Sequence, residues 1–288
     1  MRVHHINCGT MCPASARFVL GEGGLFSKAR LVCHCLVIES NDGLVLVDTG
    51  LGLHDIADTA RLGRRFIRRS APVLDPQEAA VSRVEQLGFR REDVRHIIPT
   101  HLDLDHIGGL SDFPSAQVHV FRDEHAAAMV PEGRSKLFGY RPRQWGHGPR
   151  WTPYAVDGER WFGFEAVRVI PGLSTEVLLV PLAGHTSGHC GVAVREGGRW
   201  LLHAGDAYFH HREVDPVAPR SPPGLALFQR MRSVDNAARL ANQARLRQLV
   251  RDHADEVSIF SAHCATEFDR HAAGTLAAGA PAHGAHVA

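Results

Sequence analysis

The chain alternates between short apolar runs and helical patterns over most of its length. Residues 31–38 and 44–48 are runs rich in β-branched residues, and the polar segment 40–43 between them is typical of a hairpin turn. Apolar runs predict further strands at 94–99, 117–121, 166–170, 177–182, 190–195, 200–204 and 257–261. No stretch of linker composition separates these strands. The pattern therefore predicts one α/β domain built in two layers.

Helical periodicity lies between several of these strands. An Asp-Pro pair opens a predicted helix over 76–87, and another helix is expected to begin near Asp123. A long Arg-rich helix is predicted over about 225–252. We interpret this long helix as an amphipathic packing helix rather than as a cover for the functional site or a dimer face.

Two stretches show neither pattern. Residues 131–163 are rich in Gly, Pro, Arg and Trp, so we expect a long irregular segment that forms one wall of the functional site. The Ala, Gly and His composition of residues 271–288 predicts a disordered tail. A single domain is accordingly expected over residues 1–270.

Composition and charge exclude several classes of partner. The 288-residue chain has a formal net charge of +1 and a pI of about 7.8, so no global field attracts nucleic acid or a membrane surface. No apolar run has the length of a membrane span, and the first residues lack the pattern of a signal peptide. The six cysteines form no CxxC pair and do not resemble a disulfide framework, so a cytoplasmic location is expected.

Side chains that bind metals follow four of the predicted strands. The motifs are THLDLDHIGG, GHTSGH, HAGD and FSAH, and they contribute His101, Asp103, Asp105, His106, His185, Asp206 and His263. Because each motif follows an apolar run, all of them are expected at the same edge of the sheets. Any one of these residues could be a core or capping residue. Their joint occurrence favours a common site.

The chemistry of this set indicates catalysis. Imidazole and carboxylate bind Zn²⁺, Mn²⁺ or Fe²⁺, and a set without thiolate favours a catalytic site over a structural one. Two metals about 3.5–4 Å apart can hold a bridging hydroxide and polarise a carbonyl or phosphoryl group. The sequence has no GxSxG nucleophile elbow, no Gly-Lys phosphate loop and no GxGxxG at a strand-helix junction.

The motifs, in this order, resemble the metallo-β-lactamase superfamily over roughly residues 30–268. The usual signature is HxHxDH, and the DTG at residues 48–50 also matches. The resemblance implies an αββα four-layer sandwich with the site at one edge between the sheets. It assigns one metal to His101, Asp103 and His185, a second to Asp105, His106 and His263, and the bridging position to Asp206. We interpret Asp48 as a structural residue that accepts backbone hydrogen bonds at a strand end.

One ligand departs from the superfamily signature. Asp103 stands where the signature has its second histidine, and the di-iron members of the superfamily use Glu there. The resemblance implies two divalent metal ions, with zinc first. Iron and manganese are alternatives, because a carboxylate is a harder and anionic ligand. An inactive site is disfavoured, since all other ligands are present.

Within the superfamily the chain looks most similar to the acyl-homoserine lactonase branch. That similarity implies hydrolysis of a small lactone or related ester by a metal-bridging hydroxide, with Asp105 as a proton shuttle. Tyr208 is a candidate to bind the lactone carbonyl, although the branch usually has its Tyr one position later, where this chain has Phe209. The alternatives are a phosphodiester, thioester or organophosphate hydrolase and a redox-active di-iron protein. We expect no nucleic acid or membrane partner, and a homodimer stays open.

Overall fold

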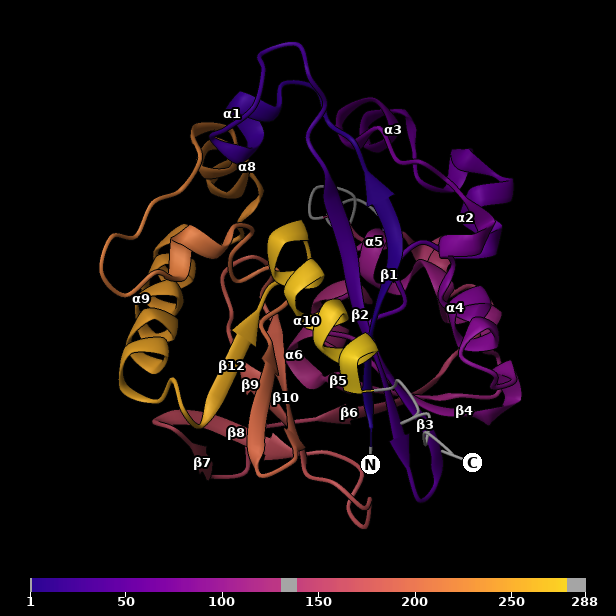
Figure 1. Cartoon of the computed structure of the whole chain (residues 1–288). Coiled ribbons are helices and arrows are strands. Elements are labelled where there is room, and N and C mark those ends of the chain that lie inside the picture. The colour runs from indigo at the N-terminus through magenta and orange to yellow at the C-terminus, as the bar shows by residue number, and fades with distance from the viewer. Residues whose placement is uncertain (1, 131–138, 279–288) are drawn as a thin grey trace, which may run out of the picture.

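Two six-stranded sheets form the centre of the computed structural model, which describes residues 2–130 and 139–278 (Figure 1). The first sheet has the order β1-β2-β3-β4-β5-β6, with the bounds Val3–Met11, Leu31–Ser40, Gly43–Val47, Val94–Ile98, Gln117–Phe121 and Arg150–Tyr154. The second has the order β12-β11-β10-β9-β8-β7, and in chain order from β7 its bounds are Glu159–Trp161, Phe164–Arg168, Val177–Pro181, Cys190–Glu196, Arg199–His203 and Val257–Phe260. Parallel pairs occur between β3, β4, β5 and β6 and between β11 and β12, so both sheets are mixed.

Helices cover the two sheets. Their bounds are Ala16–Leu20 for α1, Leu53–Ala57 for α2, Arg64–Ser70 for α3, Ala80–Gln86 for α4, Leu104–Ile107 for α5, Arg122–Ala128 for α6, Pro223–Arg232 for α8, Asn236–Asp252 for α9 and Ala265–Ala278 for α10. None of the helices in the described ranges has both the length and the apolar character needed to cross a bilayer. All six cysteines are free thiols, as expected from their spacing.

Three apolar clusters show how the layers pack. Between the sheets, Val47 and Ile98 of the first sheet share a cluster with Val192 of the second, and all three are fully buried. A second cluster joins Val84 of α4 to the outer face of the first sheet. A third joins Leu246 of α9 to the outer face of the second. The order is therefore helices, sheet, sheet, helices, with α4 and α9 on opposite sides in Figure 1, which confirms the four-layer αββα sandwich.

The long helix expected over 225–252 is two helices, so that prediction is wrong at residues 233–235. Asp235 caps α9, because its carboxylate accepts hydrogen bonds from the first backbone N–H groups of that helix. The N–H groups of Val234 and Asp235 donate to the carbonyls of His185 and Gly184, at 3.2 and 3.0 Å. The break is thus tied to the loop that carries a candidate ligand.

Other predictions change in detail. The helix expected over 76–87 is a short 3₁₀ turn at Pro76–Glu78 followed by α4. Within the segment 131–163, residues 131–138 lie outside the described residues, and the remainder contains β6, β7 and the 3₁₀ helix η6 (Pro142–Gln144) rather than irregular chain. The strand β1 was not predicted, because polar residues interrupt its apolar pattern.

The C-terminal prediction is wrong at its start. Helix α10 continues past His271 to Ala278, where the composition predicted disorder. The His271 ring stacks on His5, with ring centroids 4.6 Å apart, and packs near Phe260. These contacts hold a segment whose Ala and Gly content alone gives no packing signal. Residues 279–288 lie outside the described residues.

Histidines buried without an acidic partner should make stability depend on pH. Burial, and then the neighbouring His271, His203 and His4, lower the pKa of His5 to about 3. Burial and His96 lower the pKa of His119 to about 3. The unfolded chain therefore binds protons that the folded chain excludes at these two sites between about pH 6.5 and pH 3.

We expect stability to be fully present above about pH 6.5 and to fall as the pH drops, by roughly 1.4 kcal/mol per pH unit for each of these histidines. Urea unfolding at about pH 7 and pH 5.5, with a chelator present so that metal release does not contribute, measures the change. The double variant His5→Phe/His119→Phe should show a flatter dependence. Equal slopes in both proteins would contradict the assignment.

Candidate metal centre

The seven predicted ligands converge at the carboxyl ends of β4, β9, β11 and β12. In chain order the strands are followed by His101 and Asp103, then His185, then Asp206, then His263, while Asp105 and His106 lie on α5 directly after the first motif. One of these strands belongs to the first sheet and three to the second. The site therefore lies at an edge between the sheets. All seven side chains are buried except Asp105, which keeps 16% of its surface exposed.

Two groups of ligand atoms form within this cluster. His101, His185 and Asp206 make the group we call site one, and Asp105, His106 and His263 make the group we call site two; in each group the ligand atoms lie within 4.8 Å of one another.

Asp206 faces both sites. Its Oδ2 lies 3.8 Å from His101 Nε2 and 3.4 Å from His185 Nε2. Its Oδ1 lies 3.4 Å from His106 Nε2 and 3.1 Å from His263 Nε2. One carboxylate oxygen of Asp206 therefore points at each group of candidate ligands.

Buried polar atoms without partners indicate what the cluster can hold. His101 Nε2, His106 Nε2 and Asp206 Oδ1 are buried and find no hydrogen-bond partner among the described residues. Buried polar atoms are normally paired, so a group of such atoms aimed at a common space needs an explanation. Divalent cations would satisfy them, because imidazole nitrogens and carboxylate oxygens are their usual ligands. The residues therefore fit a metal centre.

Electrostatics keep the bridging carboxylate ionised. Burial alone would raise the pKa of Asp206, but His263, His106 and His185 around it hold that pKa well below its usual range. Burial likewise opposes the charged form of His263, yet the same carboxylate raises the pKa of this imidazole. Since metal binding requires neutral imidazoles, metal uptake is expected to release protons.

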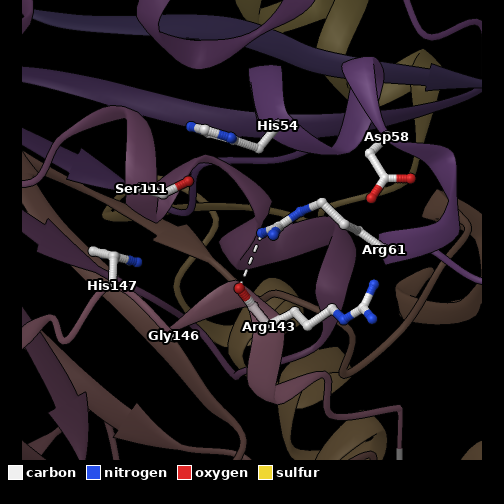
Figure 2. A pocket seen from close by; sticks show the side chains of 7 residues that line it. All are labelled: His54, Asp58, Arg61, Ser111, Arg143, Gly146 and His147. Atoms are coloured by element: carbon white, nitrogen blue, oxygen red, sulfur yellow. Dashed lines mark hydrogen bonds between the residues drawn. The ribbon is translucent and has the colours of Figure 1, made fainter.

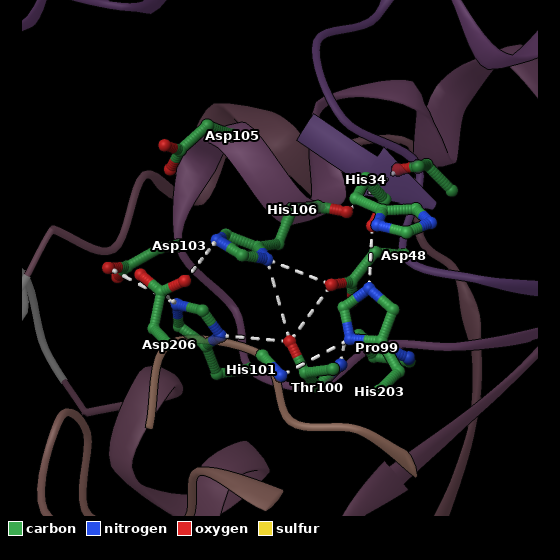
Figure 3. Close-up of polar contacts among 12 residues, drawn as sticks. His34, Asp48, Pro99, Thr100, His101, Asp103, Asp105, His106, His203 and Asp206 are labelled. Atoms are coloured by element: carbon green, nitrogen blue, oxygen red, sulfur yellow. Dashed lines mark hydrogen bonds and ion pairs between the residues drawn. The ribbon is translucent and has the colours of Figure 1, made fainter. Parts of the chain in front are cut away.

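Hydrogen bonds at Nδ1 orient the imidazoles of site two. His106 Nδ1 donates to Asp48 Oδ2 at 2.8 Å, so His106 Nε2 points toward Asp206 (Figure 3). His263 Nδ1 donates to the Val32 carbonyl at 2.7 Å, and His263 Nε2 lies 3.1 Å from Asp206 Oδ1. Asp48 also accepts hydrogen bonds from the backbone N–H and the hydroxyl of Thr100, at 2.7 and 2.9 Å. The predicted structural role of Asp48 agrees with these contacts, and its carboxylate additionally fixes one ligand.

Asp48→Asn is expected to weaken metal binding at site two roughly 10- to 100-fold. The amide has a single acceptor oxygen, whereas three donors from His106 and Thr100 converge on the carboxylate. Calorimetric titration of the metal-free protein with Zn²⁺ measures the change, and Asp255→Asn, at an exposed position, is the matched control. An unchanged affinity would mean that His106 is oriented without Asp48.

Two residues that are not among the seven predicted ligands hold the ligand loops. Glu124 of α6 is fully buried; its carboxylate accepts hydrogen bonds from the Leu102 N–H at 2.8 Å, the Thr186 hydroxyl at 2.7 Å and the Gly188 N–H at 3.2 Å. His189 accepts a hydrogen bond from the backbone N–H of Asp206 at 2.8 Å. Glu124 gives no signal in the sequence, because its partners are backbone groups and a hydroxyl far away in the chain.

Asp103 differs from the other predicted ligands. Its Oδ2 lies 3.2 Å from His185 Nε2 and 3.5 Å from His101 Nε2, which places it beside site one. The same oxygen also forms a close ion pair with Arg232 of α8. No pattern in the sequence singles out this arginine, and the prediction of an ordinary packing helix over 225–252 does not place it at the site.

Tyr208 does not lie at the cluster. Its side chain is fully buried among the residues that pack under α9, and its hydroxyl donates to Glu267 Oε1 at 2.9 Å. A buried hydroxyl with this partner is not available to a substrate at the metal centre. The next residue, Phe209, lies at the site instead, because its ring stacks on His263 with centroids 5.1 Å apart.

A separate cavity of about 520 Å³ opens between α2, the 3₁₀ helices η1 (Thr59–Arg61) and η4 (Gly108–Asp112), and η6. Figure 2 shows the Arg61 guanidinium donating to the Arg143 carbonyl, a hydrogen bond of 3.0 Å, with His54 and His147 on the facing wall. None of the predicted metal ligands lines this cavity. The candidate metal centre is therefore located by buried polar atoms without hydrogen-bond partners and not by the size of a cavity.

Comparisons with known proteins agree with the fold. Residues 29–247 match the family described as the metallo-beta-lactamase superfamily. The chain is 41% identical over 270 residues to "Probable metallo-hydrolase Rv2300c" of Mycobacterium tuberculosis, which covers 91% of this chain and 80% of the relative. It is 25% identical over 186 residues to "N-acyl homoserine lactonase AiiA" of Bacillus thuringiensis subsp. kurstaki, which covers 64% of this chain and 67% of the relative.

Solved structures share the fold. A structure of AiiA from B. thuringiensis with N-decanoyl-L-homoserine at its active site superposes with a TM-score of 0.68 at 21% identity, and covers 93% of this chain and 95% of the other. A structure of AidC, a dizinc quorum-quenching lactonase, superposes with a TM-score of 0.59 at 15% identity, and covers 91% and 87%. At these identities the likeness concerns the fold.

Proposed function

The chain belongs to the metallo-beta-lactamase superfamily and is a metal-dependent hydrolase, and from this premise we propose that it binds two divalent cations and opens a lactone or a similar ester. The observation that carries the proposal is Asp206, which presents one oxygen to each of two ligand groups. Zinc is the first candidate for both sites. Iron and manganese are alternatives because Asp103 adds an anionic oxygen beside site one.

The side chains around the two sites have separable tasks. Cations bound there would activate a water molecule and polarise an ester carbonyl. Asp105 is the most exposed of the candidate ligands, and we assign to its carboxylate the transfer of a proton to the leaving alkoxide. Phe209 stacks on His263 and contacts Phe228, whose ring centroid lies 5.5 Å away. These rings provide an apolar wall beside site two that suits the acyl part of an ester.

The name of one relative and the compound bound in its solved structure favour a lactone over other esters. AiiA is named as an N-acyl homoserine lactonase, and a B. thuringiensis AiiA structure holds N-decanoyl-L-homoserine at its active site. The apolar wall of Phe209 and Phe228 is consistent with a substrate of this kind, since an acyl chain needs apolar surface beside a polar reaction centre.

An assay on a small panel tests the proposal. The rate of hydrolysis by metal-loaded protein is measured with N-acyl lactones of several chain lengths, thioesters and bis(nitrophenyl) phosphate. Metal content is measured on the same samples. We expect close to two metals per chain and turnover of lactones, which Asp105→Ala removes and the exposed control Asp255→Ala keeps. Cleavage of a thioester or phosphodiester without turnover of any lactone would contradict the assignment of substrate.

A phosphodiester is the second candidate substrate. Arg232 places a guanidinium beside site one, and a phosphoryl group is an anion that such a group could bind. Its ion pair with Asp103 offsets that charge, so the present geometry favours the neutral ester.

A further inference from the structure

Asp103 and Arg232 form the one ion pair of the described residues that joins a predicted metal ligand to an arginine. The pair is largely withdrawn from water, since 8% of the Asp103 side chain and 19% of the Arg232 side chain are exposed. The other carboxylate oxygen, Asp103 Oδ1, is buried and has no hydrogen-bond partner among the described residues. A buried pair in this position needs a reason, because removing both charges from water is costly.

The fold holds Arg232 in place from two sides. Arg232 is the last residue of α8, and the chain after it is fixed to the ligand loop by the hydrogen bonds from Val234 and Asp235 to that loop. On the other side lies Gly139, with a φ of +88°. A Cβ at this glycine would collide with Arg232 Nη2 and lie 2.8 Å from Asp103 Oδ1. The absence of a side chain at Gly139 therefore leaves space for the ion pair of Asp103 and Arg232.

Charge explains why an arginine accompanies this carboxylate. The superfamily signature has a neutral imidazole at position 103, whereas an aspartate adds one negative charge beside site one. Arg232 supplies one positive charge, so the pair as a whole is as neutral as a histidine. This arrangement should weaken metal binding at site one, because Asp103 Oδ2 also binds the guanidinium of Arg232. The fixed positive charge of that guanidinium repels an incoming metal cation.

We propose that Arg232 is the resident counter-ion of Asp103 and that it selectively weakens metal binding at site one, so that site two fills first. This inference rests on the proposed two-metal function. Arg232 is a positioning residue here, since it acts on the centre through Asp103. Asp103 Oδ2 lies 3.2 Å from His185 Nε2 and 3.5 Å from His101 Nε2, so a charge that binds this oxygen acts at site one rather than at site two.

Metal titrations of variants test the inference without any substrate. Metal-free wild-type protein, Arg232→Met and Arg230→Met are titrated with Co²⁺, and both heat and the visible absorption of bound Co²⁺ are recorded. Arg230 is an exposed arginine of the same helix and serves as the matched control. We expect Arg232→Met to bind the second equivalent roughly 10- to 100-fold more tightly than wild type, with the first equivalent unchanged. Arg230→Met should titrate like wild type.

A second pair of variants guards against a folding defect. Asp103→Asn removes the carboxylate charge from beside Arg232 and should weaken the second equivalent, whereas adding Arg232→Met to it should recover most of that loss. Thermal melts of the metal-free proteins show whether each variant is folded. If Arg232→Met binds the second equivalent of Co²⁺ with unchanged or lower affinity, the inference is wrong. The proposed function is not affected by that result as long as the wild type binds two metals. If the wild type takes up no metal, both fail. A higher KM for an ester with unchanged metal binding would make Arg232 a substrate-binding residue and would also overturn the inference.

Discussion

Asp206→Asn is expected to lower kcat/KM by at least about 1,000-fold, which corresponds to about 4 kcal/mol of transition-state stabilisation. Asp206 is the residue that faces both ligand groups, with Oδ2 toward His185 and Oδ1 toward His263. An asparagine of the same shape has one acceptor oxygen, and its N–H₂ would point two donors at the imidazoles of one site. One of the two metals should therefore be lost together with activity.

Metal content and turnover are measured on the same preparation. Wild type should carry about two metals per chain and Asp206→Asn about one or fewer, while the exposed control Asp255→Asn should match wild type in both. The variant should remain folded in a thermal melt, because its imidazoles keep their Nδ1 hydrogen bonds to Asp48 and Val32. Two bound metals with activity within about tenfold of wild type would show that Asp206 does not bridge.

The convergence of the candidate ligands could be predicted from the sequence because each motif directly follows an apolar strand. His185 comes after β9 and His263 after β12, so the position of each side chain is fixed by the strand before it. The four-layer fold followed from the resemblance carried by the same motifs. Local sequence order was enough for the convergence of these side chains, since strand ends deliver their next residues to a common edge.

The partners of these ligands could not be predicted in the same way. Arg232 reaches Asp103 across 129 positions of the chain, and only the break after α8 directs it there. Tyr208 shows the converse error, because counting residues after Asp206 could not reveal that its hydroxyl is bound to Glu267 on α10. Sequence spacing places residues along an element, whereas contacts between elements depend on how loops turn.

Glu124→Ala should be the most destabilising of these substitutions, at roughly 3 kcal/mol or more. The carboxylate accepts hydrogen bonds from Leu102, Thr186 and Gly188 in the buried space between two ligand loops. Alanine would leave three buried donors without an acceptor, and each such group costs about 1–3 kcal/mol. For a chain of this size the melting temperature should fall by ~10 °C or more.

The same substitution should also weaken metal binding at site one. Leu102 follows His101 and Thr186 follows His185, so Glu124 holds both loops that carry the histidines of site one. Calorimetry of the metal-free protein gives the loss of stability, and a Zn²⁺ titration gives the loss of affinity, expected at roughly 10- to 100-fold. The stability and the Zn²⁺ affinity of Glu124→Gln should lie between those of Glu124→Ala and wild type, because its amide keeps one acceptor oxygen. Glu85→Ala, on the exposed face of α4, is the control. A melting temperature of Glu124→Ala within about 2 °C of wild type would mean that water replaces the carboxylate and that the two ligand loops keep their conformation without Glu124.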